Sequence, residues 1–182
     1  MKRIVLTFGL ISGAVLSVMM LATIPFMDRI GLDKGEIIGY TTMVLAFIMV
    51  FFGIRSYRDT VLDGTIGFGR AFQVGILITL ISCVCYVATW QLIYYKIAPD
   101  FVEKYTAHVL EGAKASGATE QQLAVQKAQM AKFMQWYRNP LVNVAITFVE
   151  PFPVGLVITI VCAGILRRKR AAPAPHPANA HG

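Results

Sequence analysis

Apolar residues are concentrated in long, uninterrupted stretches of this chain. Three of these stretches contain no charged residue: 4–27, 37–54 and 71–95. A helix needs about 20 such residues to cross the ~30 Å hydrocarbon core of a bilayer, because each residue adds about 1.5 Å of length. The pattern therefore predicts three membrane-spanning helices over these ranges.

A fourth apolar stretch, 151–166, is too short to span a membrane by itself, since it covers only about 24 Å as a helix. We therefore expect the fourth helix to begin earlier, over about 141–166, and to include Glu150. The predicted fold class is all-α, an integral-membrane four-helix bundle that forms a single domain over 1–170. A Pro- and Ala-rich tail at 171–182 has too few apolar residues for a core and is predicted to be disordered.

Composition and charge favour the same class of protein. The chain is 56% hydrophobic and 15% charged, whereas a soluble domain has about 25% charged residues. The net charge of +7 arises mainly at one set of helix ends, and basic residues collect on the cytoplasmic side of membrane proteins. This set comprises Lys2, Arg3, Arg55, Arg58, Arg70, Arg167, Arg168, Lys169 and Arg170. We therefore predict a bacterial inner-membrane protein with both termini cytoplasmic, and no nucleic acid is needed as a partner.

One segment, about 99–138, has the character of a soluble structure. Its apolar positions fall on helical faces: Phe101, Val102, Tyr105 and Val109, then Leu123, Met130, Phe133, Met134 and Tyr137. Thr119 and Gln122 have the spacing of a capping box, which predicts the start of a second helix after a break at 112–118. We expect an extracytoplasmic hairpin of two amphipathic helices between the third and fourth spans. The hairpin either caps the bundle or lies on the outer leaflet.

Small residues recur along one face of every predicted span, and such faces allow helices to approach closely. They are Gly9, Gly13 and Ser17; Gly39, Ala46 and Gly53; Ala71, Gly75, Thr79 and Cys83; and Gly155, Thr159 and Ala163. The pattern favours packing within one four-helix bundle. A contact seam in a homo-oligomer is the alternative.

The spans lack the residue patterns of catalytic or cofactor sites. Cys83, Cys85 and Cys162 lie inside spans without a C-x-x-C pair, and the glycine-rich segment 55–72 has neither phosphate-binding glycine spacing. Paired carboxylates and Ser-His or Cys-His sets do not occur in the spans. We therefore expect no catalytic, cofactor-binding or metal-binding residues and no enzymatic activity.

Three blocks of the chain are similar to a known family: VLTFGLISGAVLSVMM, GFGRAFQVGILITLISCVCYVATWQLIYYKIAPDF and RNPLVNVAITFVEPFPVGLVITIVCAGILRRK. Their order resembles a bacterial family of four-span membrane proteins catalogued as a domain of unknown function, number forty-one ninety-nine. The resemblance covers about residues 1–170. It implies a multi-pass membrane protein and provides no catalytic residues.

The fourth predicted helix carries the most unusual polar residues. They recur on one helical face as a polar stripe: Asn139, Asn143, Thr147 and Glu150. Polar groups inside spans normally face the bundle or a water-filled cavity. Pro151 and Pro153 lack amide hydrogens, so the helix is expected to kink or to restart near Glu150.

Two interpretations of Glu150 stay open. In one, Glu150 caps a kinked helix and pairs with an outer cation, for which the candidates are Arg29, Lys34, Lys96 and Arg138. In the other, it is a protonatable group of an outward-facing polar cavity, buried against the first and third helices. The first interpretation corresponds to a structural or interaction component of the envelope, which contacts the lipid bilayer and another membrane or envelope protein. The second corresponds to a small transporter or channel component that uses Glu150 and the polar stripe.

Overall fold

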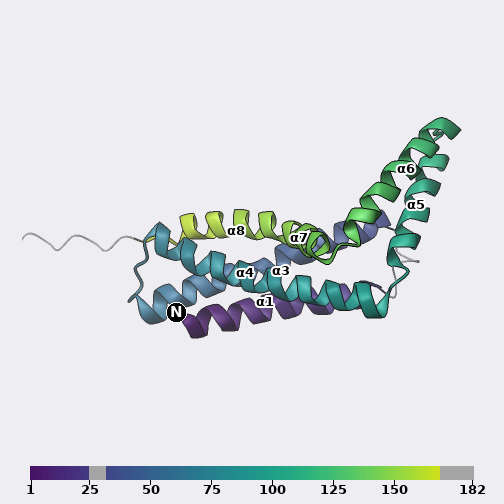
Figure 1. Cartoon of the computed structure of the whole chain (residues 1–182). Coiled ribbons are helices and arrows are strands. Elements are labelled where there is room, and N and C mark those ends of the chain that lie inside the picture. Colours follow the sequence, from purple (N-terminus) through teal and green to yellow (C-terminus); the bar gives the residue numbers. More distant parts are fainter. Residues whose placement is uncertain (25–31, 169–182) are drawn as a thin grey trace, which may run out of the picture.

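Four long helical rods lie side by side in the computed structural model, which describes residues 1–24 and 32–168 (Figure 1). They are α1 (Lys2–Thr23), α3 (Leu32–Val61), α4 (Phe68–Leu92) with the π-helix η2 (Ile93–Ile97), and a fourth rod composed of α7 (Pro140–Val149) and α8 (Pro151–Leu166). Each rod is long and apolar enough to cross a membrane. The predicted all-α fold with four apolar spans is confirmed. The predicted tail at 171–182 lies outside the described residues.

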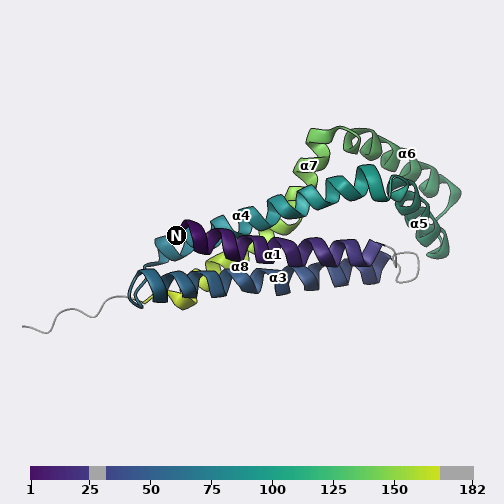
Figure 2. The ribbon, with the colours of Figure 1, turned by 90° about the horizontal axis from the view of Figure 1, so that it is seen from below.

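Two further helices, α5 (Phe101–Ala115) and α6 (Glu120–Tyr137), form a hairpin at one end of the bundle. Figures 1 and 2 show this hairpin at the end opposite the start of α1 and the end of α8. The predicted capping box is present: Thr119 Oγ1 accepts from Gln122 N at 3.3 Å, and Gln122 Oε1 accepts from Thr119 N at 2.8 Å. The break was predicted too early, because α5 continues through Gly112 and the chain turns at Gly117, where φ is +84°.

The helix α3 extends further than the apolar pattern predicted. It passes residue 54 and ends at Val61, since charged residues are compatible with a helix that continues beyond the apolar layer. Arg55 and Asp59, one turn apart, form an ion pair at 3.6 Å on this extension. The chain then turns at Asp63 and Gly64, which both have positive φ.

Small residues bring α1 against α4. A Cβ added to Gly9 would lie 2.9 Å from Ile81 Cβ, and one added to Gly13 would lie 2.6 Å from Cys85 Cβ. Ser17 Oγ accepts a hydrogen bond from Thr89 Oγ1 at 2.7 Å. All three predicted packing residues of the first span therefore contact the third span of the same chain.

A second close contact joins α8 to α3 and α4. A Cβ on Gly155 would lie 2.8 Å from Phe47 Cζ, and one on Gly75 would lie 2.8 Å from Thr159 Cγ2. Thr79 Oγ1 and Thr159 Oγ1 are 3.1 Å apart and share a hydrogen bond in this buried region. Gly75, Thr79, Gly155 and Thr159 therefore serve packing within one chain.

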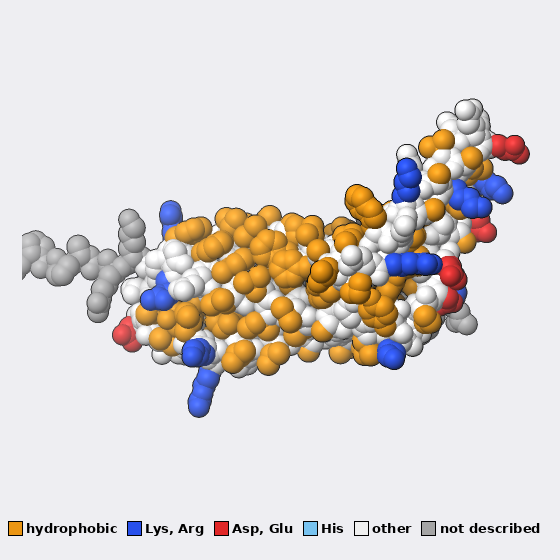
Figure 3. Space-filling model, viewed as in Figure 1, with side chains coloured by type: hydrophobic (Ala, Val, Ile, Leu, Met, Phe, Trp, Pro, Cys, Tyr) orange, Lys and Arg blue, Asp and Glu red, His pale blue; other side chains and the backbone are white. Residues whose placement is uncertain are grey.

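The outer surface of the bundle is an apolar belt between two charged ends. Figure 3 shows hydrophobic side chains covering the middle of the bundle, with Lys, Arg, Asp and Glu side chains gathered at its ends. Large apolar side chains such as Val18, Val84, Val157 and Ile165 are more than half exposed along this belt. Such a surface suits contact with lipid.

Candidate functional site

The fourth rod bends at Glu150, between α7 and α8. Glu150 itself has helical dihedral angles (φ −66°, ψ −58°) and makes no side-chain capping bond. Because Pro151 and Pro153 have no amide hydrogen, the carbonyls of Thr147 and Val149 lose their normal helical donors. Figures 1 and 2 both show α7 directed away from the line of α8. The structure thus has a bend at this point rather than a separately capped new helix.

This bend separates the neighbours of α8 from those of α7. The helix α8 packs against both α3 and α4, whereas α7 packs mainly against α4. A cavity of about 680 Å³ lies beside α7, at the hairpin end of the bundle. Residues from α1, α3, α4, α5, α6 and α7 contribute to its wall. The cavity therefore belongs to the end of the bundle where the fourth rod departs from its straight course.

The wall of the cavity is mainly apolar and aromatic. It includes Leu16, Met19, Met43, Trp90, Phe101, Val102, Tyr105, Val109, Phe133, Met134 and Tyr137. The predicted apolar face of α5 therefore lines part of the cavity. Gly39 also lines the cavity, and a Cβ there would meet nothing within 4 Å. The prediction that Gly39 serves close helix packing is wrong, since it borders open space instead.

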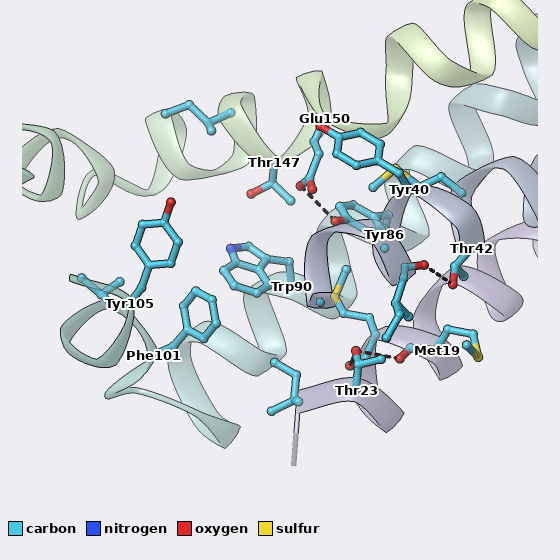
Figure 4. A pocket seen from close by; sticks show the side chains of 18 of the residues that line it. Met19, Thr23, Tyr40, Thr42, Tyr86, Trp90, Phe101, Tyr105, Thr147 and Glu150 are labelled. Atoms are coloured by element: carbon cyan, nitrogen blue, oxygen red, sulfur yellow. Dashed lines mark hydrogen bonds between the residues drawn. The ribbon is translucent and has the colours of Figure 1, made fainter. Parts of the chain in front are cut away.

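The main polar contact of the cavity joins Glu150 to α4. The Tyr86 hydroxyl donates to Glu150 Oε2 at 2.9 Å, and Figure 4 shows this bond with the Tyr40 ring beside it. The predicted contact of Glu150 with the third span is present. The prediction that Glu150 is buried is wrong, because its side chain is exposed at the wall of an open cavity. Arg29, a predicted partner, lies outside the described residues.

The four residues of the polar stripe have different surroundings. Asn139 is the N-cap of α7, where its Oδ1 accepts from Leu141 N at 3.0 Å. Asn143 is fully buried, and its Oδ1 accepts from Gln91 Nε2 at 2.6 Å. Thr147 is buried and lines the cavity together with Glu150. The structure therefore brings Thr147 and Glu150 together at the cavity, while Asn143 bonds to α4 and Asn139 caps a helix.

Two buried polar atoms of α7, Asn143 Nδ2 and Thr147 Oγ1, have no hydrogen-bond partner in the described part of the chain. The Tyr137 hydroxyl lies near Thr147, but the pair does not reach hydrogen-bond geometry. A buried polar group without a partner costs about 1–3 kcal/mol. The wall beside α7 therefore has a place where water or a polar ligand atom lowers the free energy.

Aromatic contacts attach the hairpin to α4. Trp90 Nε1 donates to the Tyr137 hydroxyl at 2.8 Å, and the Trp90 and Phe101 rings meet edge to face at 5.1 Å. Burial is the main cause that raises the pKa of Tyr137. These contacts hold both hairpin helices in position at the cavity.

Sequence reasoning missed the partners on α4. Tyr86 and Gln91 are single polar residues in a long apolar span, without the regular spacing that marked the fourth span. Their position near the end of α4 that precedes the hairpin is the signal that was available, because it places them at the level of Glu150 and Asn143 along the bundle. Among the described residues, no group of three His, Cys, Asp or Glu side chains is arranged to hold a metal ion.

Fold and site together define a helical protein with four membrane-span-like rods and a partly open, largely apolar cavity near one end. The chain matches the family described as Protein of unknown function (DUF4199) over residues 7–168. It therefore belongs to this family, as the three sequence blocks indicated. Comparisons with curated proteins and with solved structures gave no match.

Proposed function

We propose that this protein is a component of the bacterial inner membrane that binds an amphipathic small molecule in the cavity beside α7. The observation that carries the proposal is the cavity itself, with an apolar and aromatic wall and a few polar groups at Thr147 and Glu150. Its volume of about 680 Å³ falls within the ~300–1,000 Å³ of ordinary small-molecule sites. This function develops the transporter alternative from the sequence and requires no catalytic residues.

Close packing in the half of the bundle that contains α8 favours a binding protein over a pore formed by one chain. Beyond the bend, Gly155 of α8 contacts Thr79 and Phe47 closely, and Phe47 is fully buried. These side chains fill the space between α3, α4 and α8. A ligand that enters the cavity therefore has a packed floor beneath it, and transfer across the membrane requires a second conformation or a partner.

We further propose that the hairpin lies on the extracytoplasmic side and that both termini are cytoplasmic. Support comes from the start of α1 and the end of α8 at one end of the bundle (Figure 1), together with the basic residues near those ends. Reporter fusions after Ile54, Ala118 and Arg170 test this orientation. We expect cytoplasmic signals at 54 and 170 and an extracytoplasmic signal at 118. An extracytoplasmic signal at 170 contradicts the proposal.

Binding can be tested by tryptophan fluorescence, because Trp90 lines the cavity and Trp136 is 74% exposed outside it. The Trp136→Phe protein in zwitterionic nanodiscs is titrated with a brominated long-chain alcohol, and saturable quenching of Trp90 is expected. Gly39→Leu fills the cavity and should weaken this quenching about tenfold or more. Gly164→Leu is the matched control, since its position also has open space but lies on α8 outside the cavity. Equal quenching in both variants contradicts the proposal.

A second candidate function is the binding of another envelope protein through the hairpin. The observation in its favour is the exposure of large apolar side chains there, with Trp136 74% and Val125 54% exposed. Cross-linked co-purification followed by mass spectrometry, with and without Trp136→Ser and Val125→Ser, tests it. A specific partner lost in the double variant supports this function, and recovery of only further copies of the chain indicates a homo-oligomer.

A further inference from the structure

Three threonines line the described part of the cavity wall: Thr23, Thr42 and Thr147. Two of them bond to their own helices, since Thr23 Oγ1 donates to Met19 O at 3.0 Å and Thr42 Oγ1 donates to Ile38 O at 2.8 Å. Thr147 Oγ1 has no partner among the described residues, although Thr147 is only 4% exposed. Figure 4 shows its side chain pointing from α7 into the cavity. Thr147 is therefore the threonine of this wall whose hydroxyl is available to a ligand.

A second hydroxyl, that of Tyr137 on α6, lies close to Thr147. It accepts a hydrogen bond from Trp90 Nε1 at 2.8 Å, and the Tyr137 ring contacts the rings of Tyr94 and Phe133 at centroid distances of 5.6 Å and 5.7 Å. These contacts fix the position of the phenol. A hydroxyl has one proton and two acceptor positions, so the bond from Trp90 leaves the proton of Tyr137 for an acceptor. In the described part of the chain, the two hydroxyls lie near each other without bonding.

An uncharged oxygen atom beside these hydroxyls would satisfy both of them. It would accept the proton of Tyr137, and it would bond to Thr147 Oγ1, which can donate or accept. Hydroxyl and carbonyl oxygens meet this requirement, whereas an alkyl group would leave the Thr147 hydroxyl buried without a partner. Two neutral hydroxyls do not compensate for the removal of a charge from water, so this pair favours an uncharged head group.

The wall around the two hydroxyls suits an apolar body attached to that head. Phe101, Val102 and Val109 of α5 line the cavity together with Met134 of α6. The Phe101 ring meets the Trp90 ring edge to face at 5.1 Å, so the aromatic part of the wall adjoins the bond between Trp90 and Tyr137. Transfer of an alkyl chain from water to such a surface is favourable. A molecule with a polar end at Thr147 and a chain along the hairpin would use both parts of the wall.

From these observations we infer that the ligand is a neutral amphiphile, with a hydroxyl or carbonyl head group and a long apolar body. The head oxygen accepts from Tyr137 and bonds to Thr147, and the body lies against the hairpin residues that line the cavity. Glu150 keeps the bond from Tyr86, and this head group requires no change in the other contacts of that carboxylate. The inference rests on the proposed binding function and specifies its ligand class.

Three probes with one body and different heads test the inference: brominated dodecane, brominated dodecanol and brominated dodecan-2-one. Each carries bromine at the same chain position and is titrated into the Trp136→Phe protein in zwitterionic nanodiscs. Quenching of Trp90 is plotted against the mole fraction of probe in the lipid, so that differences in partitioning cancel. We expect the alcohol, the ketone or both to bind about tenfold more tightly than the alkane, because two hydrogen bonds of ordinary strength are added. The tighter of the two identifies the type of head oxygen.

Two valine substitutions assign this advantage to one residue. Thr147→Val keeps the shape of the side chain and removes its hydroxyl, so the advantage of the oxygen probe over the alkane should fall from about tenfold to about threefold. Binding of the alkane should stay unchanged. Thr42→Val is the matched control, because Thr42 also lines the cavity and is buried, but its hydroxyl bonds to its own helix. This control should keep the full advantage.

The outcomes separate this inference from the function on which it rests. Equal binding of the three probes, an advantage that persists in Thr147→Val, or an equal loss in both valine variants overturns the ligand class. The binding function still stands in these cases if Gly39→Leu weakens all three probes and Gly164→Leu weakens none. Quenching by all three probes that Gly39→Leu does not change overturns both.

Discussion

The two halves of the fourth rod show how one apolar sequence can form either a packed core or a cavity. Along α8, Gly155 lies so close to Thr79 and Phe47 that a Cβ would overlap with them. Along α7, the wall beside Thr147 borders a cavity of about 680 Å³. Both halves consist of apolar residues with occasional polar ones, so hydrophobicity alone does not explain the difference.

The difference follows from side-chain size and from one interruption of the helical hydrogen bonds. Small residues at Gly75, Gly155 and Thr159 allow α8 to lie directly on α4. At Glu150 the missing amide hydrogens of Pro151 and Pro153 allow the axis to bend. Backbone irregularity at membrane depth is tolerated where it is buried in protein or lines a cavity, and the bend at Glu150 lies on the wall of one. The packed half of the bundle along α8 thus holds the half that contains the cavity, along α7, in position.

The largest effect is expected from Gly155→Ala in the packed half. The added Cβ lies 2.8 Å from Phe47 Cζ, and Phe47 is fully buried and cannot move freely. Overpacking of this kind costs about 1–3 kcal/mol. Thermal unfolding in detergent should show a lower midpoint for Gly155→Ala.

The control for this variant is Gly164→Ala on the same helix, where the added Cβ meets nothing within 4 Å. Alanine has the higher helix propensity, so this control should be as stable as the unmodified chain or more stable. If both variants unfold at the same temperature, the two glycines have equivalent surroundings and the description of α8 as the packed half is incorrect.

The fold could be predicted to a large extent because its determinants are local. A span of apolar residues can satisfy its backbone hydrogen bonds inside a membrane only by forming a helix or a closed barrel, and small residues at Gly9, Gly13 and Gly155 marked real close contacts. Helix ends were predicted less well. Where charged residues follow the apolar stretch, as at Arg55 in α3, hydropathy reports the end of the apolar layer and not the end of the helix.

The second prediction concerns the hydrogen bond that holds α7 to α4 beside the cavity. Asn143→Leu leaves Gln91 without the acceptor that it now contacts at 2.6 Å. Hydrogen bonds between membrane helices contribute about 0.6 kcal/mol on average and up to about 1.7 kcal/mol, so we expect a coupling energy of about 1 kcal/mol between the two side chains. Asn143→Leu, Gln91→Leu and the double variant form a cycle, measured by unfolding in detergent. Additive losses would show that the two side chains are not coupled.

The candidate site could be predicted only in part. The stripe pointed to Thr147 and Glu150, and the prolines pointed to a bend, because both signals lie within one helix. Tyr86 of α4 donates to Glu150, and residues of both hairpin helices line part of the cavity. Which residues of separate helices meet depends on the bend and on helix rotation, and neither quantity is encoded by the spacing of residues in a single span.

The third prediction is a small gain of stability at Gly39 of α3, which lines the cavity beside α7. Gly39 lies inside α3, where glycine is about 1 kcal/mol less favourable than alanine, and a Cβ there meets open space. Gly39→Ala should therefore raise the free energy of unfolding by up to ~1 kcal/mol, the opposite sign to Gly155→Ala. Denaturation of both variants in one detergent provides the comparison. A loss of stability in Gly39→Ala would mean that the cavity at this position is closed in solution.

The smallest effect on the whole chain is expected at Thr119, far from both halves of the fourth rod. Thr119→Ala removes one bond of the capping box with Gln122, and loss of such a cap typically costs about 1 kcal/mol. Since α6 is attached to the bundle by contacts near its other end, at Tyr137, only the first turn of α6 should loosen. Amide hydrogen exchange should accelerate about fivefold in that turn, while the thermal midpoint of the bundle and quenching of Trp90 stay unchanged. Weakened quenching would show instead that the first turn of α6 affects ligand binding in the cavity. The region coupled to the cavity would then extend to the turn at Gly117.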